Sequence, residues 1–423
     1  MTSIENTLET PIDRESIYRR NFVVFLLDNV FFNIAYALMG TTTVIPDFVR
    51  QLTASEVLIG LFSSLFAIGN NSPQLFIARY ILRLTRKKWL FILPNIPART
   101  IMIVFAVIMV WLGRDQPHLI LIAFFICYSI AAFGDGIVAV AWADIVGSSL
   151  DHRWRARMFG MTSAITGVVM LFLAPQVRKI LGNPDVPFPN NYALLFGIAG
   201  GIFALSVVPS FFLREIVIDK VIVKMPSLSE FIPQMGQILR RDTAFRSFVA
   251  VRLLTSLFLM AAPFYIGYAT TELAFSSEEA VPAFLMMQTI GSVLGALLYA
   301  VVGARNNLLC MRIALAGVAI LPISALLAGS LGVVPLYVGF FSFGMAMTSI
   351  LSGFINWVVG YASSDQRPVY VGLANTLNAF VSLFSPILGG LVAQSFGYPP
   401  LFLIALIVIL MAFFIALRLP HTK

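Results

Sequence analysis

Four charged residues of this sequence lie inside long apolar stretches, where a charge is costly. They are Asp28, within FLLDNVFFNIAYAL at residues 25–38, and Arg99, Asp135 and Arg252. A charge at the centre of a bilayer marks a candidate functional site, and a carboxylate shielded from water takes up a proton more readily. Asp135 and Asp28 are therefore candidates for proton coupling, and Arg252 is a candidate for contact with a substrate.

The same residues have a second interpretation as structural ion pairs. Asp135 with Arg99, or Asp28 with Arg252, would hold helices together, and removal of one partner of such a buried pair costs about 3–5 kcal/mol. A loss of function in a variant would therefore not distinguish coupling from folding. Both interpretations stay open, and for Arg99 we favour the structural one.

The spacing around Asp135 indicates two different environments on one helix. Tyr128, Asp135 and Trp142 are seven residues apart and share a helix face, whereas Asp144 is nine residues beyond Asp135 and lies on the opposite face. We expect Asp135 to face a cavity rimmed by aromatic side chains. We expect Asp144 to face a neighbouring helix near the end of the span.

Other polar residues lie at helical spacing in apolar stretches and are candidates for lining a cavity. Together with Tyr128, Trp142 and Arg252, they are Asn29, Asn33, Tyr36, Ser256 and Asn356. The alternative for each is a hydrogen bond to a neighbouring helix, which is common among polar residues in membranes.

The composition explains why these positions are unusual. The 423 residues are 59% hydrophobic and 11% charged, with a mean hydropathy of +0.90, whereas soluble domains are about 25% charged. A membrane-spanning helix needs about 20 mainly apolar residues. The sequence predicts about twelve, near 22–46, 55–78, 89–112, 118–147, 158–181, 191–213, 246–270, 279–303, 308–329, 333–361, 370–394 and 399–418. The predicted fold class is an all-α integral membrane protein.

Lysine and arginine residues are concentrated in alternate loops, on the side that also holds both termini. The other side receives only Arg50, Arg114, Arg178 and Lys179. Cytoplasmic loops carry the excess of these residues, so we expect both termini to be cytoplasmic, in the plasma (inner) membrane. The net charge of +8 is spread over short loops, which argues against a nucleic-acid partner.

The two halves of the sequence resemble each other. RNFVVFLL at 20–27 is similar to RSFVAVRLL at 246–254, and ADIVG…RARMFGMTSA at 143–164 is similar to INWVVG…RPVYVGLANT at 355–376. We therefore expect six-helix bundles over residues 1–213 and 246–423, joined by a cytoplasmic loop over 214–245. Within this loop, SLSEFIPQMGQILRR is predicted to form a short amphipathic helix.

These features resemble the major facilitator superfamily of secondary transporters. The basic segment LRLTRKK at 82–88 lies where that family has a signature loop, although Leu82 and Thr85 replace its acid and glycine. ADIVGSSLDHRWRARMFG at 143–160 is similar to the family's Ala-Asp…Arg-x-Arg-x-x-Gly pattern, and GALLYAVVGARNN at 295–307 resembles its weaker second copy. The resemblance covers nearly the whole chain.

The resemblance implies two pseudo-symmetric bundles that rock about a central site. In that family the first, fourth, seventh and tenth spans line the cavity, and Asp28, Asp135, Arg252 and Asn356 fall on them. It also implies a cytoplasmic gate of ion pairs, for which the matching residues are Arg83, Arg86, Lys87, Asp144 and Arg155. The alternative for these basic residues is that they only set the topology.

The sequence carries no signature of ATP hydrolysis, of a metal site or of a catalytic centre, so we expect no enzyme activity and no cofactor. We expect a monomeric permease that moves a small organic solute by alternating access with proton coupling. Efflux of amphipathic compounds ranks slightly above uptake of a sugar, organic acid or other nutrient. A membrane receptor or lipid-handling protein without turnover is the alternative of another class.

Overall fold

The computed structural model describes residues 11–81, 84, 86–215, 236–303, 305–363 and 366–421. Within these ranges the chain forms helices and no strands. The first group of helices comprises α1 (Pro11–Met39), α2 (Val44–Leu52), α3 (Glu56–Ile81), α4 (Lys88–Leu112), α5 (Pro117–Ser149), α6 (His152–Leu181) and α7 (Asn190–Ser210). This is the all-α fold expected from the sequence.

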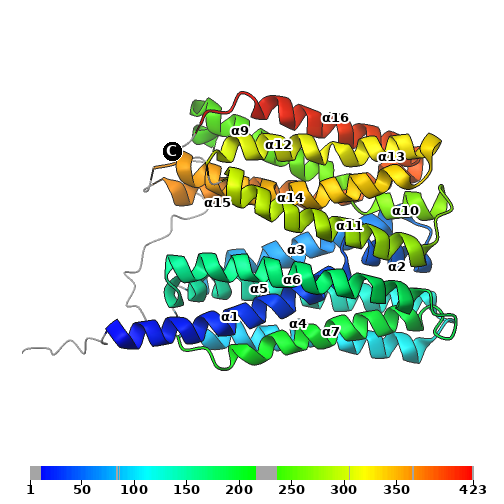
Figure 1. The fold of residues 1–423 in the computed structure, drawn as a ribbon, viewed down its shortest axis with the longest axis horizontal. Helices are drawn as coiled ribbons and strands as arrows, with labels where there is room; N and C mark the ends of the chain where they lie inside the picture. The colour runs from blue at the N-terminus through cyan, green and yellow to red at the C-terminus, as the bar shows by residue number, and fades with distance from the viewer. Residues whose placement is uncertain are drawn as a thin grey trace, which may run out of the picture.

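The second group follows the central segment. It comprises α9 (Thr243–Phe258), the 3-10 turn η1 (Leu259–Ala261), α10 (Phe264–Thr271), α11 (Ser277–Leu298), the π-helical turn η2 (Tyr299–Gly303), α12 (Asn307–Val318), α13 (Ile320–Leu331), α14 (Val334–Tyr361), α15 (Arg367–Phe396) and α16 (Tyr398–Ala416). Figure 1 shows the two groups as two layers of long, roughly parallel helices.

Eleven helical segments of the described chain are long and apolar enough to cross a membrane. Each agrees with one of the predicted spans, and the remaining span, 55–78, corresponds to α3, which packs between α5 and α15. The chain is therefore an integral membrane protein. Of the predicted amphipathic helix at 227–241, residues 236–241 are helical, and the rest lies outside the described residues.

The first predicted span is divided in two. Helix α1 ends at Met39, and the chain turns at Gly40, whose φ of 49° favours glycine. Helix α2 then begins at Val44 and lies at the end of the bundle away from both termini (Figure 1). We call this end, which holds α2 and α10, the distal end, and the other the terminal end.

A cluster of aromatic rings fixes α2 to the first group. The Phe48 side chain is fully buried and packs against the rings of Phe105, Phe124, Tyr192 and Phe196, with centroids 5.0–5.9 Å away. Each buried phenylalanine of this kind stabilises the fold by about 1.5–3 kcal/mol relative to an exposed one. The α2 backbone is therefore held rigidly where the two groups meet.

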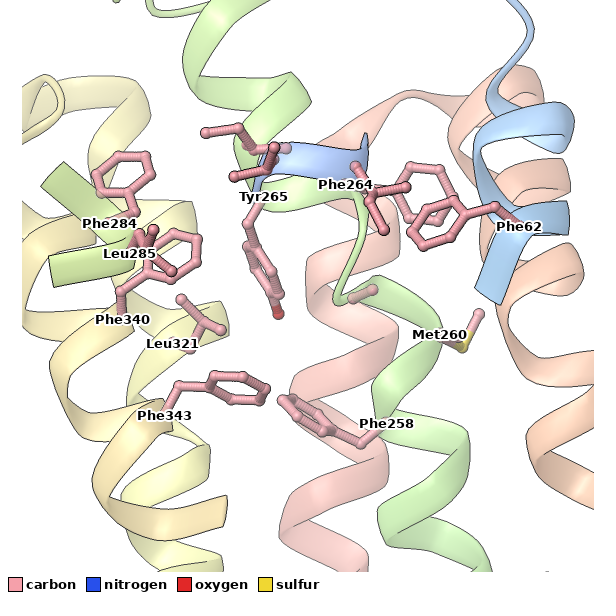
Figure 2. Packing of buried hydrophobic residues seen from close by; sticks show 14 of the residues in the cluster. Phe62, Phe258, Met260, Phe264, Tyr265, Phe284, Leu285, Leu321, Phe340 and Phe343 are labelled. Carbon is pink, nitrogen blue, oxygen red and sulfur yellow. The ribbon is translucent and has the colours of Figure 1, made fainter. Parts of the chain in front are cut away.

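The seventh predicted span is also interrupted. Helix α9 gives way to η1, and Pro263, which lacks an N–H group, precedes α10. Figure 2 shows Met260 and Phe264 from this break lying near Phe62 of α3, so apolar packing crosses from one group to the other here.

Helices α3 and α15 approach each other closely across the boundary between the groups. A Cβ atom added at Gly60 would collide with the backbone carbonyl of Pro386, and one at Gly390 would lie 2.5 Å from the carbonyl oxygen of Glu56. These glycines let the two backbones touch, as small residues do at interfaces of membrane helices.

We predict that Gly60→Ala destabilises the protein by about 1–3 kcal/mol, because the added methyl group meets backbone atoms that cannot rotate away. The measurement is the midpoint of thermal unfolding of the purified protein. Gly201→Ala is the matched control, since a Cβ atom there meets nothing within 4 Å. Equal midpoints for the two variants would contradict the close α3–α15 packing.

Candidate functional site

A cavity of about 210 Å³ lies between the two groups of helices. Helices α1, α3 and α5 line one side, and α9, η1 and α15 line the other. Its lining comprises Tyr36, Thr41, Thr42, Phe62, Ser63, Phe66, Ala67, Tyr128, Ser256, Leu259, Ala262, Pro263, Ser382, Ser385 and Pro386. Hydroxyl groups and aromatic rings dominate this lining, and none of these residues is charged.

The hydroxyl groups of the second group are held by a short chain of hydrogen bonds. The Ser256 hydroxyl donates to Asn378 Oδ1 at 2.6 Å, and the Asn378 amide donates to the Ser382 hydroxyl at 3.5 Å. Ser385 donates to the carbonyl oxygen of Ser256 at 3.1 Å. One wall of the cavity therefore presents oriented polar groups from α9 and α15.

Behind the opposite wall lies a second, smaller cavity of about 30 Å³. It shares Tyr36, Thr41, Phe66 and Tyr128 with the first cavity. This volume is large enough to hold a water molecule. Arg99 and Asp135 line this cavity, so a layer of aromatic side chains separates the charged residues from the space between the groups.

Asp28, Arg99 and Asp135 form what we call the charged cluster. Arg99 Nη2 lies 3.4 Å from Asp135 Oδ1, and Arg99 Nε donates to Asn95 Oδ1 at 2.8 Å. The guanidinium carbon also lies 4.0 Å from the centre of the Phe32 ring, a cation–π contact. Arg99 is thus held by α4, α5 and α1 together.

Asp28 completes the cluster from α1. The side chain is buried, the charges of Arg99 and Asp135 act on it, and the Trp142 side chain is a hydrogen-bonding neighbour. Among the described residues, Asp28 Oδ1, Arg99 Nη1 and Asp135 Oδ1 have no hydrogen-bond partner. Buried polar atoms without a hydrogen bond cost free energy and are uncommon in native proteins.

Of the two ion pairs considered from the sequence, Asp135 with Arg99 is present in the structure and Asp28 with Arg252 is not. Asp135 and Arg99 lie together as an ion pair, whereas Arg252 Nη2 donates to Asn375 Oδ1 at 2.8 Å within the second group. Asp28 belongs instead with Arg99 and Asp135. The pair that the structural interpretation of Arg99 predicted is therefore present, and the choice between a structural and a functional role for Arg99 stays open.

The other candidate lining residues divide between the cavity and local hydrogen bonds. Tyr36, Tyr128 and Ser256 line the cavity. The amides of Asn29 and Asn33 each donate at 2.7 Å to the carbonyl group four residues earlier in α1. The amide groups of these two asparagines therefore form hydrogen bonds within their own helix.

Asn356 lies away from the cavity. Its amide donates to the Tyr299 hydroxyl, which donates in turn to Asn307 Oδ1 at 2.9 Å. Helix α14, the tenth span, contributes no residue to the lining described above, whereas α3 and α15 contribute several. The periodicity of polar residues did not identify α3, because its lining is mostly phenylalanine and serine.

The residues proposed for a gate lie at the terminal end. Lys87 Nζ forms an ion pair with Asp144, and the Lys87 backbone N–H donates to Glu215 Oε1 at 2.7 Å. Arg86 is exposed and Arg155 is half-buried, while Arg83 lies outside the described residues. The Lys87–Asp144 pair lies within the first group, so a role in closing the two groups stays a prediction.

The fold is shared with solved structures of transporters. A mutant of the nucleoside transporter NupG has a TM-score of 0.69 and 14% identity, covering 94% of this chain and 99% of that one. The D-xylose-proton symporter has a TM-score of 0.68 and 14% identity, with 96% and 98% covered. The human organic anion transporter MFSD10 has a TM-score of 0.64 and 16% identity, with 94% and 99% covered.

No model of a known protein family matches the sequence, and no curated protein matches it. The structural similarity extends over nearly the whole chain at 11–16% identity. Such similarity identifies the arrangement of helices and no more than that. The chain therefore has the fold of the major facilitator superfamily.

Proposed function

We propose that the protein is a secondary active transporter that moves a small organic solute by alternating access. The observation that carries this proposal is the cavity between the two groups of helices, to which both groups contribute lining residues. A site that both groups build is exposed to one side or the other as the groups rock. Transporters with solved structures of the same fold support it.

The distribution of contacts supports alternating access. The polar contacts that join the two groups across described residues lie at the distal end and include Thr42 with Gln288, Ser55 with Gln394, and Arg178 with Glu279. We infer from the lysine and arginine distribution that the terminal end is cytoplasmic and that the membrane is the plasma (inner) membrane. On this orientation the described state is closed towards the outside.

The lining favours a neutral solute that carries hydroxyl groups. Serine, threonine and tyrosine hydroxyls can donate and accept hydrogen bonds, and the rings of Phe62, Phe66 and Tyr128 offer apolar faces. No charged residue in the lining would pair with an ionic solute. The similar structures named for a nucleoside and for D-xylose concern solutes with hydroxyl groups, which favours uptake of such a nutrient.

Export of an amphipathic compound is the second candidate. Four aromatic rings in one cavity suit a flat apolar molecule, which is the observation that favours it. A panel of neutral polyols, nucleosides and amphipathic compounds distinguishes the two, because a ligand that binds the folded protein raises its unfolding temperature.

We further propose that the charged cluster couples transport to protons. Two carboxylates and one guanidinium carry a net charge of −1, and one proton makes the cluster neutral. Neutrality is favoured strongly where charges are removed from water. Tyr36 and Tyr128 line both cavities, so a solute that moves these rings would change the space available to Asp135 and Arg99.

We predict that Asp135→Asn abolishes solute accumulation driven by a pH gradient but leaves exchange at equal pH. The amide keeps the size of the carboxylate and cannot release a proton. The measurement is flux of the best ligand from the panel in proteoliposomes. Asp185→Asn, an exposed loop position, is the control, and accumulation by a folded Asp135→Asn variant would refute the coupling role.

We also predict that Tyr128→Phe weakens solute binding about 2- to 10-fold, the effect of one lost hydrogen bond of about 0.5–1.5 kcal/mol. The ring remains, so thermal stability without solute changes little. Binding is measured by calorimetry. Tyr265→Phe is the matched control, because this buried tyrosine stacks on Phe402 and lies outside the cavity lining. Equal losses in both variants would exclude a specific contact at Tyr128.

Solute binding without any flux would indicate a receptor in place of a transporter. The binding measurement and the flux measurement therefore separate failure of the coupling proposal from failure of transport itself.

A further inference from the structure

Asp47 lies on α2 at the distal end and is 1% exposed. It is next to the aromatic cluster around Phe48. The Tyr192 hydroxyl of α7 donates to Asp47 Oδ2, and the Ser277 hydroxyl donates to Asp47 Oδ1 at 2.9 Å. Ser277 is the first residue of α11, so this one carboxylate joins the first group of helices to the second.

The basic residue of the same helix is already paired. Arg50 Nη1 and Nη2 donate to the two carboxylate oxygens of Glu56 at 2.6 and 2.8 Å. The Tyr398 hydroxyl of α16 donates to Glu56 Oε1 at 2.6 Å, and this contact also joins the two groups. A bidentate pair of this kind is strong and directional, so the positive charge of Arg50 is largely neutralised by Glu56.

We propose that Asp47 is a second proton-binding site of the protein, and that a proton on its carboxyl group stabilises the state in which the distal end is closed. Loss of that proton opens the distal end. This role of Asp47 in closure is independent of which solute the cavity binds.

The groups that face Asp47 determine the direction of the effect. Burial raises the pKa of Asp47 above its ordinary value, while hydrogen bonds from Tyr192 and Ser277 and the charge of Arg50 act in the opposite direction with smaller effect. Glu56 of α3 is bound to Arg50, and α11 contributes the Ser277 hydroxyl.

Opening of the distal end would separate Ser277 from Asp47 and admit water, which restores an ordinary pKa. Closure therefore takes up a proton. Because the pKa is raised in the closed state, the stabilisation of that state is complete at low pH. It is lost as the pH rises through the closed-state pKa of Asp47.

A test uses the full-length protein in lipid nanodiscs without solute. Spin labels are attached at Asp185→Cys in the first group and Ser330→Cys in the second, both exposed positions near the distal end. The two native cysteines are buried and are replaced by alanine. The distance between the labels is measured across a pH series. We expect short distances in acid and a growing population of long distances in alkali.

Variants of the Asp47 contacts supply the decisive comparison. Asp47→Asn, which resembles the protonated carboxyl group, should remain closed at every pH. Tyr192→Phe removes a donor to the carboxylate, so the midpoint of opening should move to higher pH. A wild-type protein without pH-dependent opening, or an Asp47→Asn variant that opens as the wild type does, would overturn the proposal.

Glu279→Gln is the matched control. The Glu279 carboxylate also joins the two groups, through an ion pair with Arg178 at 3.1 Å. Both side chains of this pair are about half exposed or more. Exposed ion pairs contribute little, so this variant should open with the wild-type midpoint. If Glu279→Gln abolished the pH dependence while Tyr192→Phe left the midpoint unchanged, the proton site would not be Asp47. If Asp47→Asn failed to fold, the midpoint of Tyr192→Phe would decide the question alone.

Discussion

A carboxylate inside a membrane-spanning bundle needs compensation, because neither lipid nor apolar side chains can solvate it. The four acids compared here are compensated in three ways. Asp135 and Asp28 share one guanidinium, that of Arg99. Glu56 has a complete bidentate partner in Arg50, whereas Asp47 has hydroxyl donors from two helices.

These differences separate structural acids from acids that can change their protonation state. Glu56 accepts three hydrogen bonds, two of them from a cation, and a charged carboxylate is the form that accepts them all. Asp28 and Asp135 share a single cation, and each has one oxygen atom without a hydrogen-bond partner among the described residues. Two acids near one guanidinium leave one negative charge without a cation, and this is the feature on which the proposed coupling role rests.

The sequence predicted the spans and the buried charges well, because both depend on properties of short segments. Hydropathy over about 20 residues located each long helix, and Asp28, Asp135 and Arg99 were conspicuous against apolar neighbours. The sequence did not predict α2, which lies partly within the first apolar run, and therefore Asp47 was missed. An acid beside Pro46 is typical of a loop, and nothing local indicates that aromatic rings from α4, α5 and α7 bury it.

Contacts between segments far apart in the chain could not be predicted from the sequence either. Glu56 meets Tyr398, and Asp47 meets Ser277, across separations of 342 and 230 residues. No periodicity encodes such pairs, since each residue alone reads as an ordinary polar position at a helix end. The same reasoning explains why α3 and α15 were not expected in the cavity wall, because phenylalanine and serine residues there resemble packing residues.

The two proposed proton sites occupy complementary positions in the fold. The residues of the charged cluster all belong to the first group of helices, and no hydrogen bond or ion pair joins them to the described residues of the second group. On the proposal above, the cluster acts on the second group through Tyr36, Thr41, Phe66 and Tyr128, which line both cavities. Asp47 touches both groups directly, and a ligand shifts an equilibrium only through contacts that differ between the two states. On these proposals a proton on Asp47 acts on closure directly, whereas a proton on the charged cluster acts on closure through the residues that line both cavities.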